Sequence, residues 1–277
     1  MARPEVRRRL IVNADDFGRS RSINQAVIRA HREGILTSAS LMVNEAARDE
    51  AVALARENPR LGVGLHLALV CGRSALSCER IPGLVDARGE FSADPVRTGL
   101  NYFFQRGLRT QIEDELAAQF ARFRATGLQM DHVNGHLHMH LHPVVFDILL
   151  HRAVDWGLAR IRLTRDEFWL NARLARGRWL SRLAHAVIYR TLSGRSRRRL
   201  MRRGIRFTPR VFGLLQNARV DESFVLGLLA RLPAGDSELY SHPSLDEFRH
   251  EFEALISPEV RQCVAEHGIE LIRYADL

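Results

Sequence analysis

Short apolar runs alternate along the chain with segments whose apolar residues recur at helical spacing. Residues 10–14, 36–43 and 62–69 are apolar and β-prone, whereas 22–34 and 45–57 repeat apolar positions with the period of a helix. Alternation of this kind is typical of a parallel sheet with helical crossovers. The later part of the chain continues it, with helices predicted at 110–126 and 143–156 and strands at 130–134, 159–163, 237–241 and 269–273.

These alternating elements predict one α/β domain spanning residues 1–277. We expect an irregular (β/α) barrel of parallel strands with fewer than eight of them, and a doubly wound open sheet is the alternative. From about 166 to 210 the pattern is mostly helical and basic, which predicts an insertion into the barrel. Residues 70–95 show no clear period and contain Gly, Pro, Ser and Asp, so a long loop is expected there.

Polar side chains lie where the first and third predicted strands end. Asp15 and Asp16 directly follow the first strand, with Gly18 to turn the chain, and His66 interrupts the third strand. Taken singly, such an Asp pair is more often a turn or a helix cap, and a lone histidine is more often a satisfied core residue. The carboxyl ends of parallel strands, however, are where chemistry is expected in both architectures.

A run of histidines near the fourth strand changes this interpretation. Five of the twelve histidines fall within eleven residues at even spacing, so on an extended segment their side chains and that of Asn134 would project from one face. Neutral imidazole is a common ligand of divalent metals, and a core has no use for so many titratable rings. A surface histidine tract is the alternative. The five are His132, His136, His138, His140 and His142.

Together the strand ends offer a carboxylate from the first strand and histidines from the third and fourth. One Asp with two His leaves positions open for water and substrate, as a catalytic metal requires, and hydrolysis is the natural reaction class. The second Asp of the pair is then a candidate general base, and His242, after the strand at 237–241, a candidate general acid. We expect one divalent ion, with magnesium or zinc as first candidates, although manganese and cobalt also suit this set.

These motifs resemble those of the YdjC-like carbohydrate deacetylase family, which includes chitooligosaccharide deacetylases. The resemblance rests on the motifs at residues 13–18, 64–66, 132–143 and 241–243. It covers the chain from about 9 to 163, and beyond that only residues 241–243. It implies a barrel similar to that of polysaccharide deacetylases. It also implies an enzyme that uses a divalent metal to remove acetyl groups from N-acetylated amino sugars.

The resemblance assigns roles by motif position. Asp16, His66 and His136 look like the metal ligands, Asp15 looks like the base, and His242 takes the position of the acid. Many family members carry Asp-Ser-His-His-His where this chain has Asn-Gly-His-Leu-His. The chain's own version is similar to the branch associated with hopanoid biosynthesis, which implies an N-acetylglucosaminyl group on a polycyclic lipid as the substrate.

Charge adds a second feature. The formal net charge is +9, and all 41 basic residues are arginine because the sequence contains no lysine, which excludes Schiff-base and P-loop lysine chemistry. Eight arginines fall within 195–210 without an acid, a pattern compatible with peripheral contact of Arg195–Arg210 with an anionic membrane surface. A core-facing helix with a solvated basic end is the favoured interpretation. The apolar stripe just before the block comprises Trp179, Leu180, Leu183, Val187, Ile188 and Leu192.

Other partners and settings follow from what the sequence lacks. No aromatic interleaving accompanies the arginines, so no nucleic-acid partner is expected. Cys71, Cys78 and Cys263 form no C-x-x-C pair, and no run approaches the length of a membrane span, which together favour a cytoplasmic setting that includes the inner face of the membrane. The sequence makes no prediction of oligomeric state.

Two other functions stay open on the residues alone. An amidohydrolase-type or phosphoesterase-type metal hydrolase also uses H-x-H pairs at barrel strand ends. Here, however, the run lies mid-chain and no lysine is present to bridge two metals. A non-enzymatic protein that binds membrane surfaces through Arg195–Arg210 is the other alternative.

Overall fold

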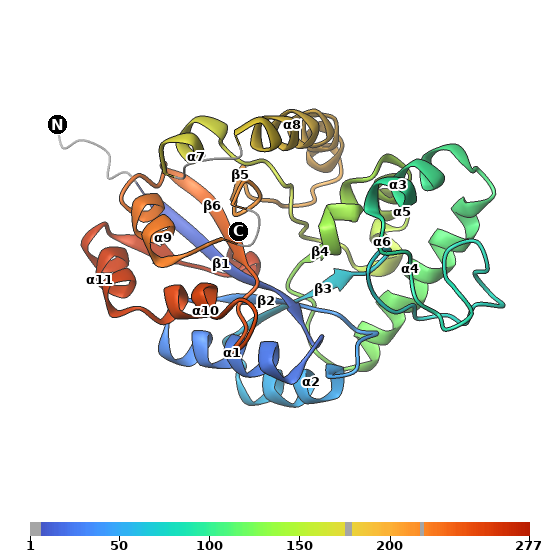
Figure 1. Cartoon of the computed structure of the whole chain (residues 1–277), viewed down its shortest axis with the longest axis horizontal. Coiled ribbons are helices and arrows are strands. Elements are labelled where there is room, and N and C mark those ends of the chain that lie inside the picture. The colour runs from blue at the N-terminus through green and yellow to red at the C-terminus, as the bar shows by residue number, and fades with distance from the viewer. Residues whose placement is uncertain (1–6, 175–178, 217–218) are drawn as a thin grey trace.

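One sheet of parallel strands forms the centre of the molecule (Figure 1). The computed structural model describes residues 7–174, 179–216 and 219–277. Over this part of the chain the sheet has seven strands in the order β4-β3-β2-β1-β6-β5, and β7 pairs with the first residues of β1. The strands are β1 (Arg8–Phe17), β2 (Ser38–Leu41), β3 (Gly62–Leu67), β4 (Val133–Gly135), β5 (Arg210–Phe212), β6 (Gly235–Ser241) and β7 (Ile269–Leu271).

Backbone hydrogen bonds beyond β4 bring the sheet round toward β5. The Ile161 amide donates to the Arg206 carbonyl (3.0 Å), and the Val211 amide donates to the Arg165 carbonyl (3.0 Å). The result is the predicted irregular barrel of parallel strands. The strand predicted at 159–163 is wrong in detail, because that segment makes isolated bridges to its neighbours rather than a continuous ladder.

Helices cover the outside of the sheet. In Figure 1, α1 and α2 lie below it, α9 to α11 on the left, α3 to α6 on the right, and α8 across the top. No helix in the described ranges is long and apolar enough to cross a membrane. The helices are α1 (Arg21–Glu33), α2 (Arg48–Glu57), α3 (Pro95–Phe104), α4 (Leu108–Ala125), α5 (Pro143–His151), α6 (Ala153–Trp156), α7 (Phe168–Leu174), α8 (Trp179–Arg202), α9 (Glu222–Leu229), α10 (Arg249–Ile256), α11 (Pro258–Glu266), and the 3-10 helices η1 (His136–Leu141) and η2 (Tyr274–Asp276).

Most predicted elements of the first half have a counterpart. The helix predicted at 22–34 is α1, where the Ser20 hydroxyl accepts from the Ile23 amide and caps the first turn. The helix predicted at 143–156 is divided into α5 and α6. The 70–95 segment is a loop with two short antiparallel bridges ahead of α3.

The predicted insertion at about 166–210 corresponds to α7, α8 and β5. Residues 175–178 of that range, and the side chain of Trp179, lie outside the part of the chain that the structure describes. β5 was not predicted; it pairs in parallel with β6 and so belongs to the barrel itself.

Alternation along β1 separates an apolar outer face from a largely polar barrel interior. Leu10, Val12 and Ala14 belong to the large core between sheet and helices. Ile11 belongs instead to a small separate cluster with Ile272 and Tyr274. Asn13 and Asp15 share the parity of Ile11, so the barrel interior becomes polar toward the carboxyl ends of the strands.

Close packing inside the barrel accounts for a glycine beside the β3 histidine. A Cβ atom on Gly64 would come within 2.5 Å of the His132 ring and 2.6 Å of the His132 carbonyl oxygen. The backbone of β3 therefore lies so close to the segment entering β4 that only a residue without a Cβ atom fits at position 64. This close approach sets the register that pairs His66 with Asn134.

Candidate metal centre and active site

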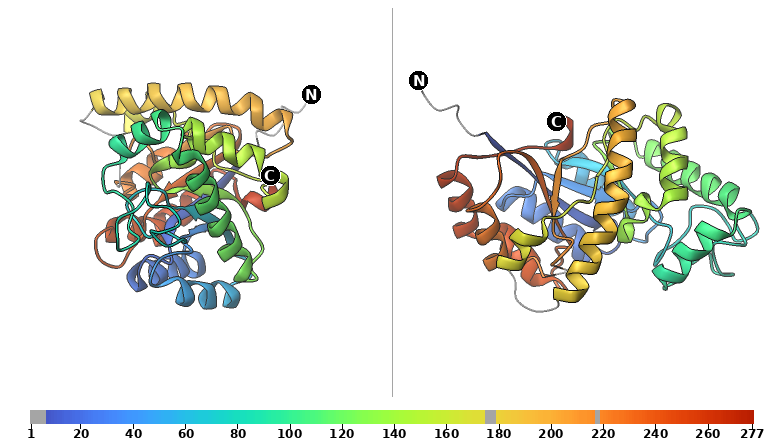
Figure 2. Two further views of the ribbon diagram at one scale, coloured as in Figure 1. Left: turned by 90° about the vertical axis from the view of Figure 1, so that its right-hand side faces the viewer. Right: turned by 90° about the horizontal axis from the view of Figure 1, so that it is seen from above.

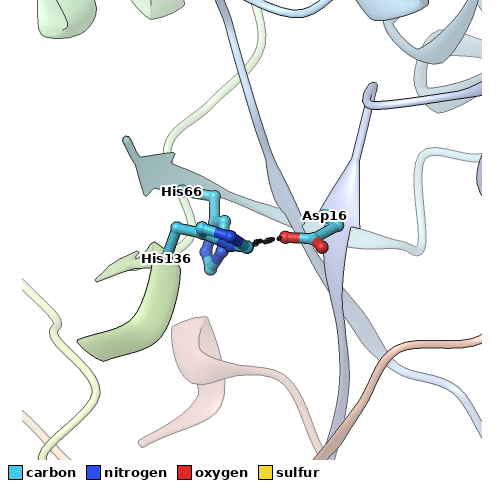
Figure 3. Close-up of side chains that lie close together, drawn as sticks. All are labelled: Asp16, His66 and His136. Atoms are coloured by element: carbon cyan, nitrogen blue, oxygen red, sulfur yellow. Dashed lines mark hydrogen bonds and ion pairs between the residues drawn. The ribbon is translucent and has the colours of Figure 1, made fainter. Parts of the chain in front are cut away.

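Three predicted residues meet at the carboxyl edge of the sheet. Asp16 lies at the end of β1, His66 near the end of β3, and His136 directly after β4. His136 Nδ1 is 3.0 Å and His66 Nε2 is 3.3 Å from the same Asp16 Oδ1, and one ligand atom of each residue lies within 4.8 Å of the others. Figure 3 shows both imidazoles directed at the carboxylate. These separations suit a small cation, since ligand distances of about 2.0–2.2 Å place neighbouring ligands roughly 3–3.5 Å apart.

The backbone at Asp16 explains how two adjacent carboxylates serve one site. Asp15 continues the inward parity of Asn13, whereas Asp16 adopts a left-handed conformation with φ of 63°. A non-glycine residue in this region stores strain, which is typical of functional sites. The Arg19 guanidinium donates to Asp16 Oδ2 at 2.9 Å, which leaves Oδ1 directed toward the two histidines.

Asn134 orients the His66 ring. His66 Nδ1 donates to Asn134 Oδ1 at 2.7 Å, so Nε2 carries the lone pair. His66 Nε2 is buried and has no hydrogen-bond partner among the residues that the structure describes; its approach to Asp16 lacks hydrogen-bond geometry. A buried lone pair without a donor is what a metal ligand presents, so the donor set fits a divalent cation.

Asp15 is held by a buried arginine. Two nitrogens of Arg162 donate to the two oxygens of Asp15 at 2.7 and 2.9 Å, and Asn13 donates to Oδ1 at 2.9 Å. Arg162 is fully buried and also pairs with Glu238 at 2.6 Å, while Tyr274 donates to the other oxygen of Glu238. The carboxylate of Asp15 is thus fixed by a network that crosses the barrel interior.

Both aspartates are ionised in this setting. Burial alone raises the pKa of Asp15, but the charge of Arg162 outweighs it and holds that pKa below its usual range. Burial likewise raises the pKa of Asp16, and the hydrogen bond with His136 together with the neighbouring His66 ring holds it well below the usual value. An ionised Asp16 suits a metal ligand, and an ionised Asp15 suits a proton acceptor.

A cavity of about 640 Å³ opens onto this group. Its lining includes Asp15, Asp16, His66, His136 and His242. The structure therefore brings all five predicted site residues to one cavity, although they come from four different strand ends. His242 follows β6 and lies 3.9 Å from Glu251, with a partly exposed ring.

The five histidines do not share one face, because the segment does not stay extended. Leu137 and His138 both have positive φ and turn the chain into η1. His136 alone of the five joins the Asp16 group in the described part of the chain. His132 contacts Asp131 and Ser40 within the barrel, His138 contacts Tyr240 and Thr164, His140 donates to the Arg162 carbonyl, and His142 contacts the Gly99 carbonyl.

Burial makes two of these histidines neutral. It lowers the pKa of His138 well below its usual value and that of His140 to about 3. His138 lines the cavity, where its Nε2 lies 2.9 Å from the Tyr240 hydroxyl. His138 is therefore a neutral part of the cavity wall, whereas His140 is not among the lining residues.

The arginine block is divided by the fold. The Arg199 guanidinium pairs with Asp147 at 2.5 Å, and Arg210 pairs with Glu167 at 2.7 Å. Arg206 donates to the carbonyl of Leu277. Arg199, Arg206 and Arg210 therefore have partners within the fold. Other arginines of the same block, at the end of α8, are exposed.

Sequence reasoning missed Arg162 and the wall that α8 contributes. A signal for Arg162 existed, since a charged residue within the apolar run 161–163 must find a partner when buried. The cavity wall from α8 includes Ile188 and Tyr189, which the sequence showed as part of a helix without indicating what it packs against.

Comparison with known proteins identifies relatives of this chain. A family model described as "YdjC-like protein" matches residues 9–266. A Brevibacillus brevis protein named carbohydrate deacetylase is 45% identical over 148 residues, which are 53% of this chain and 56% of that protein. A Salmonella dublin chitooligosaccharide deacetylase is 36% identical over 169 residues, 58% of this chain and 61% of that protein. The chain thus spans little more than half the length of these curated relatives.

A solved structure shares the fold. A crystal structure of an Enterococcus faecalis V583 protein, described as a candidate cellobiose-phosphate cleavage protein, matches with a TM-score of 0.74 over 98% of both chains. Its sequence identity of 24% makes this a likeness of fold alone. The irregular barrel is therefore a known arrangement of these elements.

Proposed function

The chain belongs to the YdjC-like protein family, and on that premise we propose that it hydrolyses the acetamide of an N-acetylated amino sugar. The observation that carries the proposal is the group of Asp16, His66 and His136 at the floor of a cavity that also contains Asp15 and His242. The named deacetylase activity of the relatives supports the same reaction.

The ligand set supports a metal-dependent reaction. We assign Asp16, His66 and His136 as the residues that hold one divalent cation, magnesium or zinc in the first place. A divalent cation held there supplies Lewis-acid activation of water and of the amide carbonyl. Among the described residues this is the one such group, which favours a one-ion hydrolase over the two-ion alternative.

Asp15 and His242 supply the proton transfers. Asp15, ionised and held by Arg162, accepts a proton from the attacking water. His242 donates a proton to the departing amine nitrogen, so that the C–N bond breaks to give acetate and a free amino sugar. Glu251 accepts a hydrogen bond from the His242 backbone amide at 2.6 Å, which holds the backbone at this position.

Two further features belong to the proposal. The whole of 1–277 acts as one barrel domain, in which 166–210 forms an insertion that lines the cavity. The amino sugar is carried by a lipid, as in hopanoid biosynthesis, which is supported by the apolar side chains of Leu137 and Ile188 in the cavity wall.

Acetate release tests the proposal directly. We expect acetate from N-acetylglucosaminyl compounds, and we expect a chelator to abolish release and added zinc or magnesium to restore it. The substrates compared are soluble N-acetylated oligosaccharides and lipid-linked N-acetylglucosamine. Release that is unchanged by exhaustive chelation would contradict the metal assignment, and absence of release from every member of the panel would contradict the reaction.

Asn134 offers a finer test of the centre. Replacing Asn134 with Leu removes the acceptor for His66 Nδ1–H, so we expect metal affinity to fall by about 10–100-fold. Isothermal titration with zinc measures this. Asn134→Asp is the matched control, because it retains an oxygen at the same place and should bind far better than the Leu variant. Equal affinity in the Leu variant and the native protein would show that the ring needs no orienting partner.

A further inference from the structure

Helix α3 exposes an apolar stripe. Val96, Leu100, Phe103 and Phe104 are spaced as i, i+4, i+7 and i+8, so they share one face of the helix. All four are at least half exposed, and Phe104 reaches 71%. We call these four residues the α3 stripe. Large apolar side chains grouped on a surface mark an interaction site.

Helix α8 exposes a second stripe with two chemical halves. Leu180, Leu183, Val187 and Ile188 lie at the same kind of spacing and are exposed. We call them the α8 stripe. The same face of the helix continues into the second half of α8, where its exposed residues are Arg195, Arg198 and Arg202. The opposite face of that half is buried through Ser193, Ser196 and Leu200.

The charge of α8 is of one sign. Trp179–Arg202 contains no acidic residue, and no ion pair holds Arg195, Arg198 or Arg202 within the described part of the chain. The outward face of α8 is therefore apolar over its first half and positively charged over its second. This is the composition of helices that lie in the interface of an anionic membrane.

Both stripes reach the mouth of the catalytic cavity. Val96 from the α3 stripe, Ile188 from the α8 stripe and the exposed Leu137 all line that cavity. Figure 2 shows α3 and the first half of α8 at the same end of the molecule, set apart from each other in the right panel. One residue of each stripe and Leu137 thus line the same cavity, and we call the α3 stripe, the α8 stripe and Leu137 together the apolar rim.

We propose that the apolar rim docks on an anionic lipid bilayer, with the arginines of the second half of α8 against the lipid phosphates and the cavity mouth facing the membrane. The docking proposal rests on the proposed function in one respect: docking would bring a lipid-carried substrate to the cavity. Charge complementarity selects the bilayer as occupant, because an acid-free basic face next to an apolar face matches phosphate beside hydrocarbon. The surface differs from the arginine block as predicted from sequence, since Arg199, Arg206 and Arg210 are engaged within the fold.

Vesicle sedimentation without any substrate tests the docking. At low salt we expect the protein to sediment with phosphatidylglycerol-containing vesicles and not with pure phosphatidylcholine vesicles. Phe103→Ser with Phe104→Ser should lower the partition coefficient roughly tenfold or more, as should Leu180→Ser with Val187→Ser. Val154→Ser is the matched control, since Val154 on α6 is 89% exposed and lies outside the rim.

The basic half has its own control. The triple change of Arg195, Arg198 and Arg202 to Gln should weaken binding to anionic vesicles. The same change at the exposed Arg60, Arg231 and Arg261 alters net charge equally and should leave most binding intact.

Several outcomes would overturn the docking proposal. The first is that anionic vesicles do not retain the native protein, and the second is that the control variants lose as much binding as the rim variants. The third is that the native protein does not bind vesicles and the rim variants have a lower oligomeric mass than the native protein. That result would make the rim a contact between copies of the chain. Acetate release from a soluble oligosaccharide should be unchanged in the Phe103 and Phe104 variant. Because vesicle binding is measured without substrate, a failed deacetylase assay and a failed docking assay are separate results.

Discussion

Replacing Asp15 with Asn is expected to lower kcat by about 100-fold to 10,000-fold while zinc affinity stays close to native. The variant keeps the size of the side chain and one oxygen for Arg162, but it removes the proton acceptor. Activity is measured as acetate release at saturating metal, and affinity is measured by calorimetry. Because the Asp15 carboxylate does not belong to the ligand group, a loss of turnover without a loss of metal separates the base from the ligands.

Folding must be controlled in this experiment, since Asp15 neutralises the fully buried Arg162. Removing one partner of a buried ion pair destabilises a protein, although Glu238 still pairs with Arg162 here. Asp131→Asn is the matched control: Asp131 is also buried and contacts a histidine, His132, but it lies outside the cavity. It should lower thermal stability without a comparable loss of turnover. An Asp15→Asn enzyme that is folded and keeps more than a tenth of native kcat would rule out Asp15 as the base.

Replacing His66 with Ala is expected to remove both metal binding and turnover. The loss of affinity should exceed the 10–100-fold that follows from losing an outer hydrogen-bond partner, because a ligand atom itself is gone. Zinc titration and acetate release at raised metal concentration measure the two effects. Turnover should recover in part at high metal if Asp16 and His136 still hold the ion.

His140→Ala provides the comparison for His66→Ala. Both histidines are buried in the same barrel, but His140 Nε2 donates to the Arg162 carbonyl rather than facing Asp16. The His140 variant should lose thermal stability and keep zinc affinity near native. If both variants lost zinc equally, the effect would be one of folding, and the assignment of His66 as a ligand would fail.

The barrel interior links these experiments. Asp15, Arg162 and Glu238 form a continuous buried chain of ion pairs, and Tyr274 near the end of the chain donates to Glu238. The Asp15 carboxylate is thereby held in a network of residues from β1, the segment after α6, β6 and η2. Such a network of ion pairs and hydrogen bonds fixes the position of a charged group in the buried interior of the barrel. Packing of apolar side chains alone would not fix it.

The sequence by itself determined the alternation of strands and helices and the grouping of Asp15, Asp16, His66, His136 and His242 at one edge of the sheet. Both follow from short-range pattern. Apolar periodicity fixes the element, and in a parallel sheet the carboxyl ends of all strands must lie together. Residues placed at strand ends are then neighbours in space, whatever their separation along the chain.

The residue pattern left open which histidine of the run joins Asp16; the family resemblance indicated His136, and the tertiary structure places His136 beside that carboxylate. Even spacing predicted a shared face for an extended chain, but positive φ at Leu137 and His138 turns the segment, so that only the first histidine after β4 points at the carboxylate. The pairing of Asp15 with Arg162, 147 residues apart, was equally hidden. So was the cavity that Val96 from α3 and Ile188 from α8 both line. Spacing along a chain encodes local geometry, whereas contacts between distant segments depend on how whole elements pack.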